Sequence, residues 1–430
     1  MTLTERDRAA IWHPLTQHQI TPPAIPIARG EGAYLFDERG NRYLDLISSW
    51  WVNIHGHAHP VIAEAIYNQA KTLEQVIFAG FTHEPAITLA EKLLALLGKP
   101  FDKVFYSDNG STAVEVALKM SYQYWHNQGQ TQRTRFMSFR EGYHGDTIGA
   151  MSVGQDSVYF KLFSDLLFPV EMFDYPATWL NDEAFEDKEK KVLADIADYL
   201  ERHAQETVAM ILEPLVQGAA GMRMCRSQFL QQLVSLLKSH NVLVIYDEIM
   251  TGFYRTGELF AFKKSETLPD ILCLSKGLTA GFLPLSVTVC HEKIYEAFLS
   301  NDFSRALAHS HSFTANPLGC ASALASVELL EHPETKAQVK RIEGVHCDIL
   351  SKRQHKLARF CGTIAAFELT LSADYGSKTS VQLRELFLKQ GLLIRPIGNV
   401  VYLLPPYCVT ETELRNAYDA IDNIIEGIKA

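Results

Sequence analysis

The chain of 430 residues is 47% hydrophobic and 21% charged, a composition typical of globular proteins and unlike that of disordered or fibrous ones. Its 40 Lys and Arg and 50 Asp and Glu residues give a formal net charge of -10, and no basic block offsets it, so we expect no nucleic-acid partner. No segment reaches the roughly 18 apolar residues of a membrane span, and residues 1–10 are charged where a signal peptide is apolar. We therefore expect a cytoplasmic protein that acts on small molecules and does not bind a membrane.

Residues that bind metals are present, but their spacing does not favour a metal site. The seven cysteines are scattered, odd in number and never form a Cys-x-x-Cys pair, which argues against disulfides and zinc and predicts mostly reduced, buried thiols. His55, His57 and His59 alternate as metal ligands sometimes do, but no acidic partner lies nearby in the sequence and Pro60 starts a helix. We interpret these histidines as turn residues and expect no metal.

The first predicted element is a β-hairpin within residues 32–46, where two apolar runs flank a polar turn. From about residue 55 to residue 325, short apolar runs alternate with segments of helical period. The predicted strands here are residues 104–106, 209–212, 242–246 and 271–274, with helices from Thr112 and over residues 227–239. The polar run 181–191 is interpreted as a solvated excursion or as the start of a surface helix. Near-continuous apolar strands are typical of a mainly parallel sheet buried on both faces, which predicts the α/β class.

The C-terminal part has a different pattern. It predicts helices over residues 321–330, 335–355 and 411–428 and strands over residues 363–369 and 400–404, as in a smaller α+β domain. We therefore expect three parts: an N-terminal segment (1–54) that packs with the small domain, a large α/β domain (55–330) and a small C-terminal domain (331–430).

Lys276 closes the apolar run 271–274 and is followed by Gly277, which opens a turn. Sites in parallel sheets form at the carboxyl ends of strands. A partly desolvated lysine has a lowered pKa, and its neutral amine can form a Schiff base with an aldehyde. The alternative is a lysine that reaches solvent at the end of a strand.

A second buried strand, within residues 241–246, ends in the carboxylates Asp247 and Glu248. A buried carboxylate needs a cationic partner, and the protonated pyridine nitrogen of an electron-sink cofactor is one such partner. The alternative is a carboxylate that caps the helix that follows.

A third strand runs into Asn109 and Gly110, after which Ser111 or Thr112 is expected to cap a helix. The backbone amides, the hydroxyl groups and the positive end of that helix would meet at one point, which is suited to a phosphate. The apolar face of the predicted helix consists of Ala113, Val116, Ala117, Met120 and Tyr124.

A lysine for an aldehyde, an acid for a ring nitrogen and a helix N-terminus for a phosphate are the three contacts that pyridoxal 5'-phosphate (PLP) requires. Six motifs are spread from residue 108 to residue 321: DNGSTAVEVALKM, FREGYHGDT, LEPLVQGAAGM, IYDEIMTGFYRTG, LSKGLTAG and HSFTANPLGCA. In these motifs the chain resembles the class III aminotransferases of the fold-type-I PLP superfamily. The resemblance implies a large domain with a mainly parallel sheet and a smaller α+β domain.

The resemblance assigns roles to individual residues. It implies that Lys276 is the Schiff-base lysine, that Asp247 is the partner of the pyridinium nitrogen, and that Gly110 and Ser111 bind the phosphate. It also implies that Tyr143 stacks on the cofactor ring next to the substrate, with Asp146 in support. Arg395 would bind a substrate carboxylate, for which its bidentate geometry is suited, and Arg255 would organise the site rather than react.

The loop from Ala308 to Pro317 resembles the segment that, in this family, reaches the cofactor phosphate of a second subunit. The resemblance thus implies a homodimer with active sites at the subunit interface, in which His311 and Ser312 contact the cofactor and Ser310 the substrate. The usual Gly-Pro-Thr of this loop is Ser310-His311-Ser312 here. Ser312 retains the hydroxyl group, whereas the side chains before it alter the local backbone and the fit of the substrate.

Three further stretches resemble one branch of the family, which transfers the amino group of S-adenosylmethionine to 8-amino-7-oxononanoate in biotin synthesis. They are IWHP at residues 11–14, SSWW at residues 48–51 and the segment from Ile394 to Tyr407. Trp50 is suited to wall a slot for an aliphatic substrate. Leu15 stands where this branch has a tyrosine that holds the amino donor, so an aminotransferase for ornithine, 4-aminobutyrate or lysine remains an alternative. A non-catalytic binding protein with the same fold is a third possibility, disfavoured by the intact Lys276, Asp247 and Tyr143.

Overall fold

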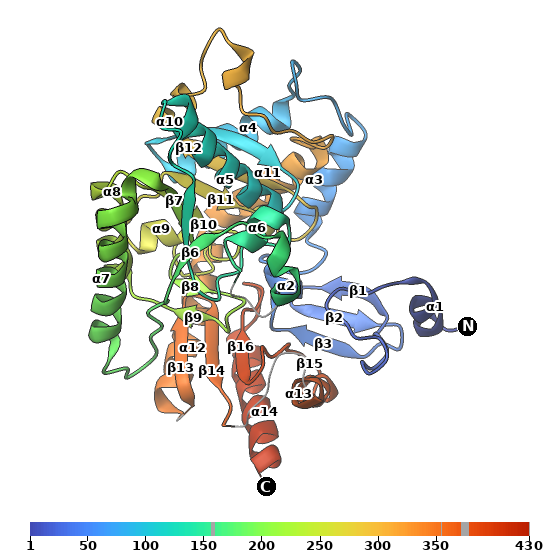
Figure 1. Ribbon diagram of the computed structural model, residues 1–430. Coiled ribbons are helices and arrows are strands. Elements are labelled where there is room, and N and C mark those ends of the chain that lie inside the picture. Colours follow the sequence, from blue (N-terminus) through green and yellow to red (C-terminus); the bar gives the residue numbers. More distant parts are fainter. Residues whose placement is uncertain (156–159, 354, 371–377, 430) are drawn as a thin grey trace.

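The computed structural model describes residues 1–155, 160–353, 355–370 and 378–429. A seven-stranded sheet lies at its centre, with the strand order β4-β12-β11-β10-β7-β5-β6 (Figure 1). The strands are β4 (Phe101–Ser107), β5 (Arg135–Phe139), β6 (Val170–Phe173), β7 (Thr207–Leu212), β10 (Leu243–Asp247), β11 (Ile271–Leu274) and β12 (Ser286–His291). Only β12 runs antiparallel to its neighbours, so the predicted α/β class and the mainly parallel sheet are confirmed.

The central strands are buried because helices cover both faces of the sheet. Leu243 and Ile245 of β10 pack with helix α5 on one face, whereas Val244 and Tyr246 pack into the larger core that contains helix α8. The helices around the sheet are α3 (Pro60–Ala70), α4 (Glu84–Leu97), α5 (Gly110–Asn127), α6 (Ile148–Ser152), α7 (Phe185–His203), α8 (Ser227–Ser239), α9 (Ala261–Lys264), α10 (Glu292–Glu296) and α11 (Pro317–Glu331). Of the predicted apolar face of α5, all but Tyr124 is buried.

The C-terminal part is a second layer of sheet and helix below the large sheet (Figure 1). Its antiparallel sheet has the order β13-β14-β16. The elements are α12 (Pro333–Lys352), β13 (Lys356–Cys361), β14 (Ile364–Glu368), α13 (Lys378–Lys389), β15 (Leu392–Leu393), β16 (Val400–Leu403) and α14 (Glu411–Lys429). Helix α12 ends before its predicted end at residue 355, and residue 354 lies outside the described residues.

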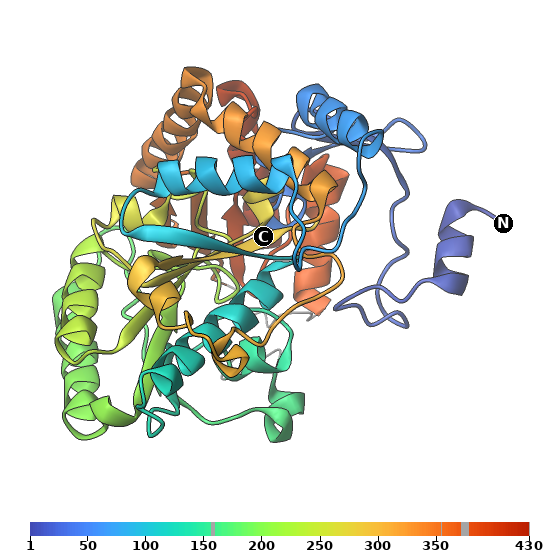
Figure 2. The ribbon, with the colours of Figure 1, turned by 90° about the horizontal axis from the view of Figure 1, so that it is seen from above.

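The predicted N-terminal hairpin is present and joins the C-terminal part. Strand β3 pairs in parallel with β15, so four strands, in the order β1-β2-β3-β15, form one sheet. Seen from above, helix α1 stands apart from the rest of the molecule (Figure 2), and none of its residues is buried. The N-terminal elements are α1 (Leu3–Ala10), β1 (Ile27–Glu31), β2 (Tyr34–Asp37), β3 (Arg42–Asp45) and α2 (Ser48–Trp51).

Short elements complete the described part of the chain: the two-stranded sheet β8 (Val216–Gln217) and β9 (Arg223–Met224), and the 3-10 turns η1 (Lys161–Leu166), η2 (Ala204–Glu206), η3 (Lys276–Thr279) and η4 (Phe303–Arg305).

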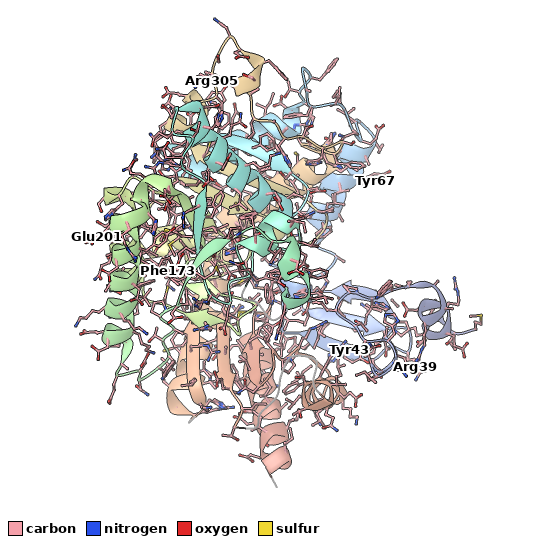
Figure 3. The ribbon with its side chains drawn as sticks, in the orientation of Figure 1. Arg39, Tyr43, Tyr67, Phe173, Glu201 and Arg305 are labelled. Atoms are coloured by element: carbon pink, nitrogen blue, oxygen red, sulfur yellow. The ribbon has the colours of Figure 1, made fainter. Side chains whose placement is uncertain are left out.

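Helix α7 has an outer and an inner face. Glu201 of α7 points away from the molecule, whereas Phe173 of β6 lies inward of the helix (Figure 3). The ring of Phe173 packs edge-on against Tyr199 of α7. Residues 185–191 of the polar run form the first turns of this helix, so of its two interpretations the start of a surface helix is confirmed.

Two local predictions were wrong. Asn109, rather than Ser111 or Thr112, caps α5, since its side chain accepts a hydrogen bond from the Thr112 N–H. His57 has an acidic partner after all, because the chain folds back and places Asp45 Oδ2 at 2.9 Å from His57 Nε2. The prediction of mostly reduced, buried thiols is confirmed: all seven cysteines are free and four are buried, whereas Cys361 and Cys408 are half-buried and Cys347 is exposed.

The described residues hold neither a cluster of metal-binding side chains nor a membrane-spanning helix. No group of three or more His, Cys, Asp or Glu side chains in this part of the chain is arranged to hold a metal ion. Within the same residues, no helix has the length and apolar character needed to cross a membrane.

Candidate active site

A cavity of about 690 Å³ lies at the carboxyl ends of β10 and β11, between the large sheet and the N-terminal and C-terminal parts. Most of the predicted site residues line it, namely Trp50, Gly110, Ser111, Tyr143, Asp247, Lys276 and Arg395. The chain therefore brings together side chains that are up to 345 positions apart, counted from Trp50 to Arg395. The position of the cavity agrees with the rule that ligands bind at the carboxyl ends of parallel strands.

Lys276 lies directly after β11 and faces the cavity. Its backbone has φ +46°, the left-handed region that side chains other than glycine rarely adopt. Its ammonium nitrogen lies 4.5 Å from the centre of the Trp51 ring. Burial lowers the pKa of Lys276 to about 8, so about a tenth of its amine is neutral at pH 7, far more than for an ordinary lysine.

Asp247 ends β10 and is 4% exposed. Its Oδ2 lies 2.8 Å from Nδ1 of His144, and its Oδ1 accepts a hydrogen bond from the Ile249 N–H at 3.1 Å. The adjacent Glu248 points elsewhere and accepts hydrogen bonds from the Ala261 and Phe262 N–H groups at the start of α9. Of the two carboxylates that end this strand, one faces the cavity and the other caps a helix.

His144 is a residue of the site to which the sequence patterns assigned no role. It is 2% exposed, and its Nδ1 contacts Oδ2 of Asp247. This contact fixes the carboxylate in one orientation. Its position next to Tyr143 in the FREGYHGDT motif was the available signal, but a histidine in a loop does not by itself indicate a partner 103 residues away.

The N-terminus of α5 forms one end of the cavity. The amides of Gly110 and Ser111 begin the helix and have no partner within it, so they are available to an anion. Ser111 Oγ accepts a hydrogen bond from the Asp146 N–H at 3.2 Å, which brings the 145–146 segment beside the helix. Gly145 has φ +128°, and a Cβ atom there would collide with the Ser111 side chain. Asp146 thus contributes its backbone here, and its side chain is exposed.

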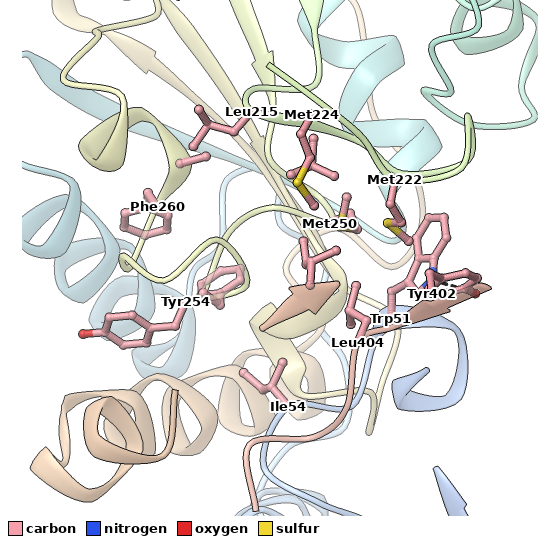
Figure 4. Close-up of a cluster of buried hydrophobic side chains, with 14 of the residues drawn as sticks. Trp51, Ile54, Leu215, Met222, Met224, Met250, Tyr254, Phe260, Tyr402 and Leu404 are labelled. Atoms are coloured by element: carbon pink, nitrogen blue, oxygen red, sulfur yellow. Dashed lines mark hydrogen bonds between the residues drawn. The ribbon is translucent and has the colours of Figure 1, made fainter. Parts of the chain in front are cut away.

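The paired tryptophans lie on a left-handed turn. Ser48, Ser49, Trp50 and Trp51 have φ angles of 51°, 46°, 74° and 73°. Such a turn costs roughly 1–2 kcal/mol per residue and persists only where its surroundings hold it. Ser48 Oγ donates to the Leu404 carbonyl at 2.7 Å, and Trp51 Nε1 donates to the Tyr402 hydroxyl at 3.2 Å (Figure 4). Strand β16 and the segment after it therefore fix this turn.

Arg255 holds the same turn from the other side. Its guanidinium group is 1% exposed and donates to the carbonyls of Trp51, Asn53 and Pro405 at 3.4, 2.9 and 2.9 Å. It is not among the residues that line the cavity. Arg255 therefore holds the turn in place from outside the cavity, and the organising role that the resemblance implied stays a prediction.

The two tryptophans have different environments. Trp51 is 5% exposed and packs between Tyr402 and Met222 (Figure 4), with the Lys276 amine over its ring. Trp50 is 39% exposed, and the Arg395 guanidinium lies 4.7 Å from the centre of its ring. Trp50 and Arg395 are thus adjacent at the entrance, whereas Trp51 forms part of the cavity floor. Sequence reasoning did not identify the contact between Trp51 and Lys276.

Ser310, His311 and Ser312 do not line the cavity of their own chain. Their loop packs against other surface segments: Gln75 Nε2 donates to the Ser312 carbonyl at 2.7 Å, and Lys119 Nζ donates to the Ala308 carbonyl at 2.7 Å. Their predicted contacts with the site of a second subunit remain a prediction. Leu15 and Pro14, in contrast, line the cavity directly.

Comparisons with known proteins agree with this geometry. The family model of the class III aminotransferases matches residues 15–425. Adenosylmethionine-8-amino-7-oxononanoate aminotransferase of Synechococcus elongatus is 50% identical over 97% of this chain and 99% of its own length. The Helicobacter pylori protein of the same name is 38% identical over 99% of this chain and 98% of its own length.

Solved structures of similar proteins show the same fold. The crystal structure of adenosylmethionine-8-amino-7-oxononanoate aminotransferase from Methanocaldococcus jannaschii, 38% identical, has a TM-score of 0.89 and covers 99% of this chain and 98% of its own. A PLP-bound amine transaminase from an uncultivated Pseudomonas species, 31% identical, has a TM-score of 0.89 over 96% of this chain and 97% of its own. The cavity, the family match and these relatives together show that the chain belongs to the class III aminotransferases.

Proposed function

We propose that this protein uses PLP to transfer the amino group of S-adenosylmethionine to 8-amino-7-oxononanoate, giving 7,8-diaminononanoate. The observation that carries the proposal is the convergence of Lys276, Asp247 and the N-terminus of α5 on one cavity, with Trp50 and Arg395 at its mouth. Relatives that span nearly the whole chain carry the name of this activity.

The residues present fit PLP. The carboxylate of Asp247 is buried and aimed into the cavity, as a partner for a pyridinium nitrogen must be. The first turn of α5 and the glycine at position 145 leave a cradle for an anion beside Ser111. When bound, PLP supplies an electron sink for the charge that develops at the substrate carbon next to the nitrogen.

Lys276 is the residue that we assign to the proton transfers. Its lowered pKa makes the amine available both for linkage to an aldehyde and for taking a proton from the substrate Cα. Asp247, held by His144, keeps the proton on the ring nitrogen of the cofactor. The Trp51 ring limits the positions that the Lys276 nitrogen can take.

The mouth of the cavity is suited to the substrate. Arg395 provides a bidentate donor for a carboxylate, and the Trp50 ring beside it gives a flat apolar surface for an aliphatic chain. Tyr143 lines the same cavity with Phe160 stacked behind it at 5.9 Å, so its ring is supported for contact with the cofactor.

We also propose the assembly that the resemblance implied. In a homodimer, the loop that contains His311 and Ser312 would reach the cofactor phosphate of the other subunit, and Ser310 would lie near its substrate. The exposure of Phe303 and Phe313, at 91% and 60%, supports a protein contact at this loop.

The proposed division into residues 1–54, 55–330 and 331–430 is supported by the separate sheets of the large and small domains.

The second candidate is an aminotransferase for ornithine, 4-aminobutyrate or lysine. The observation that favours it is Leu15, which lines the cavity without the hydroxyl group of a tyrosine. Leu15→Tyr tests whether this position selects the donor: if Leu15 only packs against the donor, the variant retains the donor preference of the natural chain.

The experiment measures 7,8-diaminononanoate by mass spectrometry from 8-amino-7-oxononanoate and one amino donor at a time. We expect product with S-adenosylmethionine and none above the Lys276→Ala background with ornithine or 4-aminobutyrate. Product formed with lysine but not with S-adenosylmethionine would contradict the proposed donor and identify lysine as the donor. Amino transfer from ornithine, 4-aminobutyrate or lysine to a 2-oxo acid, with no 8-amino-7-oxononanoate present, would support the second candidate instead.

A further inference from the structure

Glu213 is a buried carboxyl group in the wall of the cavity that the proposed mechanism does not use. It follows β7, the strand next to β10, and is 6% exposed. Its Oε1 accepts a hydrogen bond from the Gly218 N–H at 3.0 Å, and its Oε2 accepts one from the Tyr143 N–H at 3.4 Å. The carboxyl group therefore joins the turn after β7 to the segment that carries Tyr143 and His144.

A second hydrogen bond ties the same two segments together. Gln217 Nε2 donates to the Arg140 carbonyl at 3.1 Å. Gly142 lies between the two bonds, where a Cβ atom would come within 3.1 Å of the Phe139 carbonyl oxygen. The backbone around Tyr143 is thus packed closely, and the Glu213 carboxyl group contacts it on the side of the cavity.

Four titratable groups from other segments interact with the charge of Glu213. They are His144, Asp247 at the end of β10, Lys276 after β11, and Tyr175 after β6. Burial raises the pKa of Glu213 to about 7, with the charge of Asp247 acting in the same direction and that of His144 in the opposite one. Glu213 therefore changes its charge in the neutral range, next to the groups assigned to the chemistry.

We propose that Glu213 is a positioning residue of this site: its carboxyl group fixes the Tyr143–His144 segment against the cavity, and its charge sets the proton affinity of the Lys276 nitrogen. The inference rests on the proposed function. Ionised Glu213 adds a second negative charge to that of Asp247 and favours the protonated nitrogen of Lys276. Protonated Glu213 leaves Asp247 as the remaining nearby negative charge, and the desolvated nitrogen then loses its proton more readily.

The test compares Glu213→Gln with the natural chain as full-length, PLP-loaded protein without an amino substrate. The readout is the pH midpoint of the visible absorbance change of the cofactor bound to Lys276. We expect the variant to lower this midpoint by roughly 0.5–1 pH unit, because a nearby negative charge is lost. We also expect kcat to show a correspondingly altered pH profile.

Glu248→Gln is the matched control. Glu248 is equally buried, is adjacent to Asp247 in sequence and has a pKa raised by burial to about 8, but it caps α9 and does not line the cavity. We expect this variant to change stability and to leave the midpoint at Lys276 where it is. Equal shifts in both variants would overturn the proposal, as would an unchanged midpoint in Glu213→Gln.

Glu213→Asp provides an independent test in case the glutamine variant does not fold. It keeps the charge and shortens the reach to the Tyr143 N–H, so we expect a retained midpoint with a kcat lowered at least tenfold. An unchanged kcat would contradict the positioning role. Because the midpoint is read without an amino donor, failure of S-adenosylmethionine to react would count against the proposed function and not against this inference.

Discussion

At the scale of single residues, the site combines a buried lysine whose pKa is lowered with a buried carboxylate that a histidine holds in place. Lys276 is buried beside an aromatic ring, which lowers its pKa to about 8, while Asp247 is kept ready for a cation by His144. Sequence patterns identified Lys276 and Asp247 because each closes an apolar strand. They did not identify His144, since a partner supplied by a distant loop leaves no periodic or spacing signal.

The role of Asp247 gives the first prediction. Asp247→Asn keeps the size of the side chain but removes the charge that we propose holds a proton on the cofactor ring nitrogen, so we expect kcat to fall by about 10²-fold or more. Steady-state kinetics with S-adenosylmethionine measure this loss. His144→Asn, which leaves the carboxylate in place but unsupported, should lose less. A greater loss in His144→Asn than in Asp247→Asn would reverse the assigned order of roles.

At the scale of elements, the α/β alternation and most of the helices could be predicted, because period and length fix them. The exact start of α5 could not, since Asn109, Ser111 and Thr112 are all residues that cap helices. The left-handed turn at residues 48–51 could not be predicted either, because nothing local in SSWW favours positive φ angles. The turn is held by hydrogen bonds that Arg255 donates to it and that Ser48 donates to the C-terminal part.

The cap of α5 supplies the second prediction. Asn109→Ala removes the acceptor for the Thr112 N–H, so we expect about 1 kcal/mol lower stability in denaturant unfolding and a weaker affinity for PLP. Thr410→Ala is the control, since Thr410 caps α14 far from the cavity. It should lose similar stability and bind PLP as the natural chain does. Equal PLP affinities in the two variants would show that the α5 terminus does not hold the cofactor.

At the scale of the whole molecule, the cavity exists because three parts of the chain meet. Trp50 comes from the N-terminal segment, Asp247 and Lys276 from the large sheet, and Arg395 from the segment after β15. The parallel pairing of β3 with β15 brings the first and last of these parts together. Such a pairing between residues far apart in sequence has no local signature, so the sequence patterns did not predict which strands pair.

The buried carboxylates give a prediction for the stability of the whole molecule. Burial raises the pKa of Glu248 from 4.5 to about 8, so the folded chain binds this proton more tightly than the unfolded chain. The stabilising contribution of the protonated group is therefore present at low pH and is lost as pH rises from about 4.5 to about 8. That loss is on the order of 5 kcal/mol, for a shift of about 3.5 pH units at about 1.4 kcal/mol per unit.

Glu248→Gln cannot ionise and removes this dependence. We expect its stability relative to the natural chain to increase between pH 5 and pH 8 when both are unfolded with denaturant at each pH. The lost hydrogen bond to one α9 amide lowers stability by the same amount at every pH and does not change the slope. A constant difference between the two proteins across this range would contradict the assignment of a raised pKa to Glu248.

The most direct test of the central claim is to locate the cofactor on the chain by borohydride reduction and peptide mass spectrometry, before and after S-adenosylmethionine is added. The account predicts that the PLP mass is attached to the peptide containing Lys276, and that prior incubation with S-adenosylmethionine removes it. Attachment to another lysine would contradict the assignment of the site. Retention of the mass on Lys276 after S-adenosylmethionine, with loss after ornithine, lysine or 4-aminobutyrate, would contradict the proposed donor.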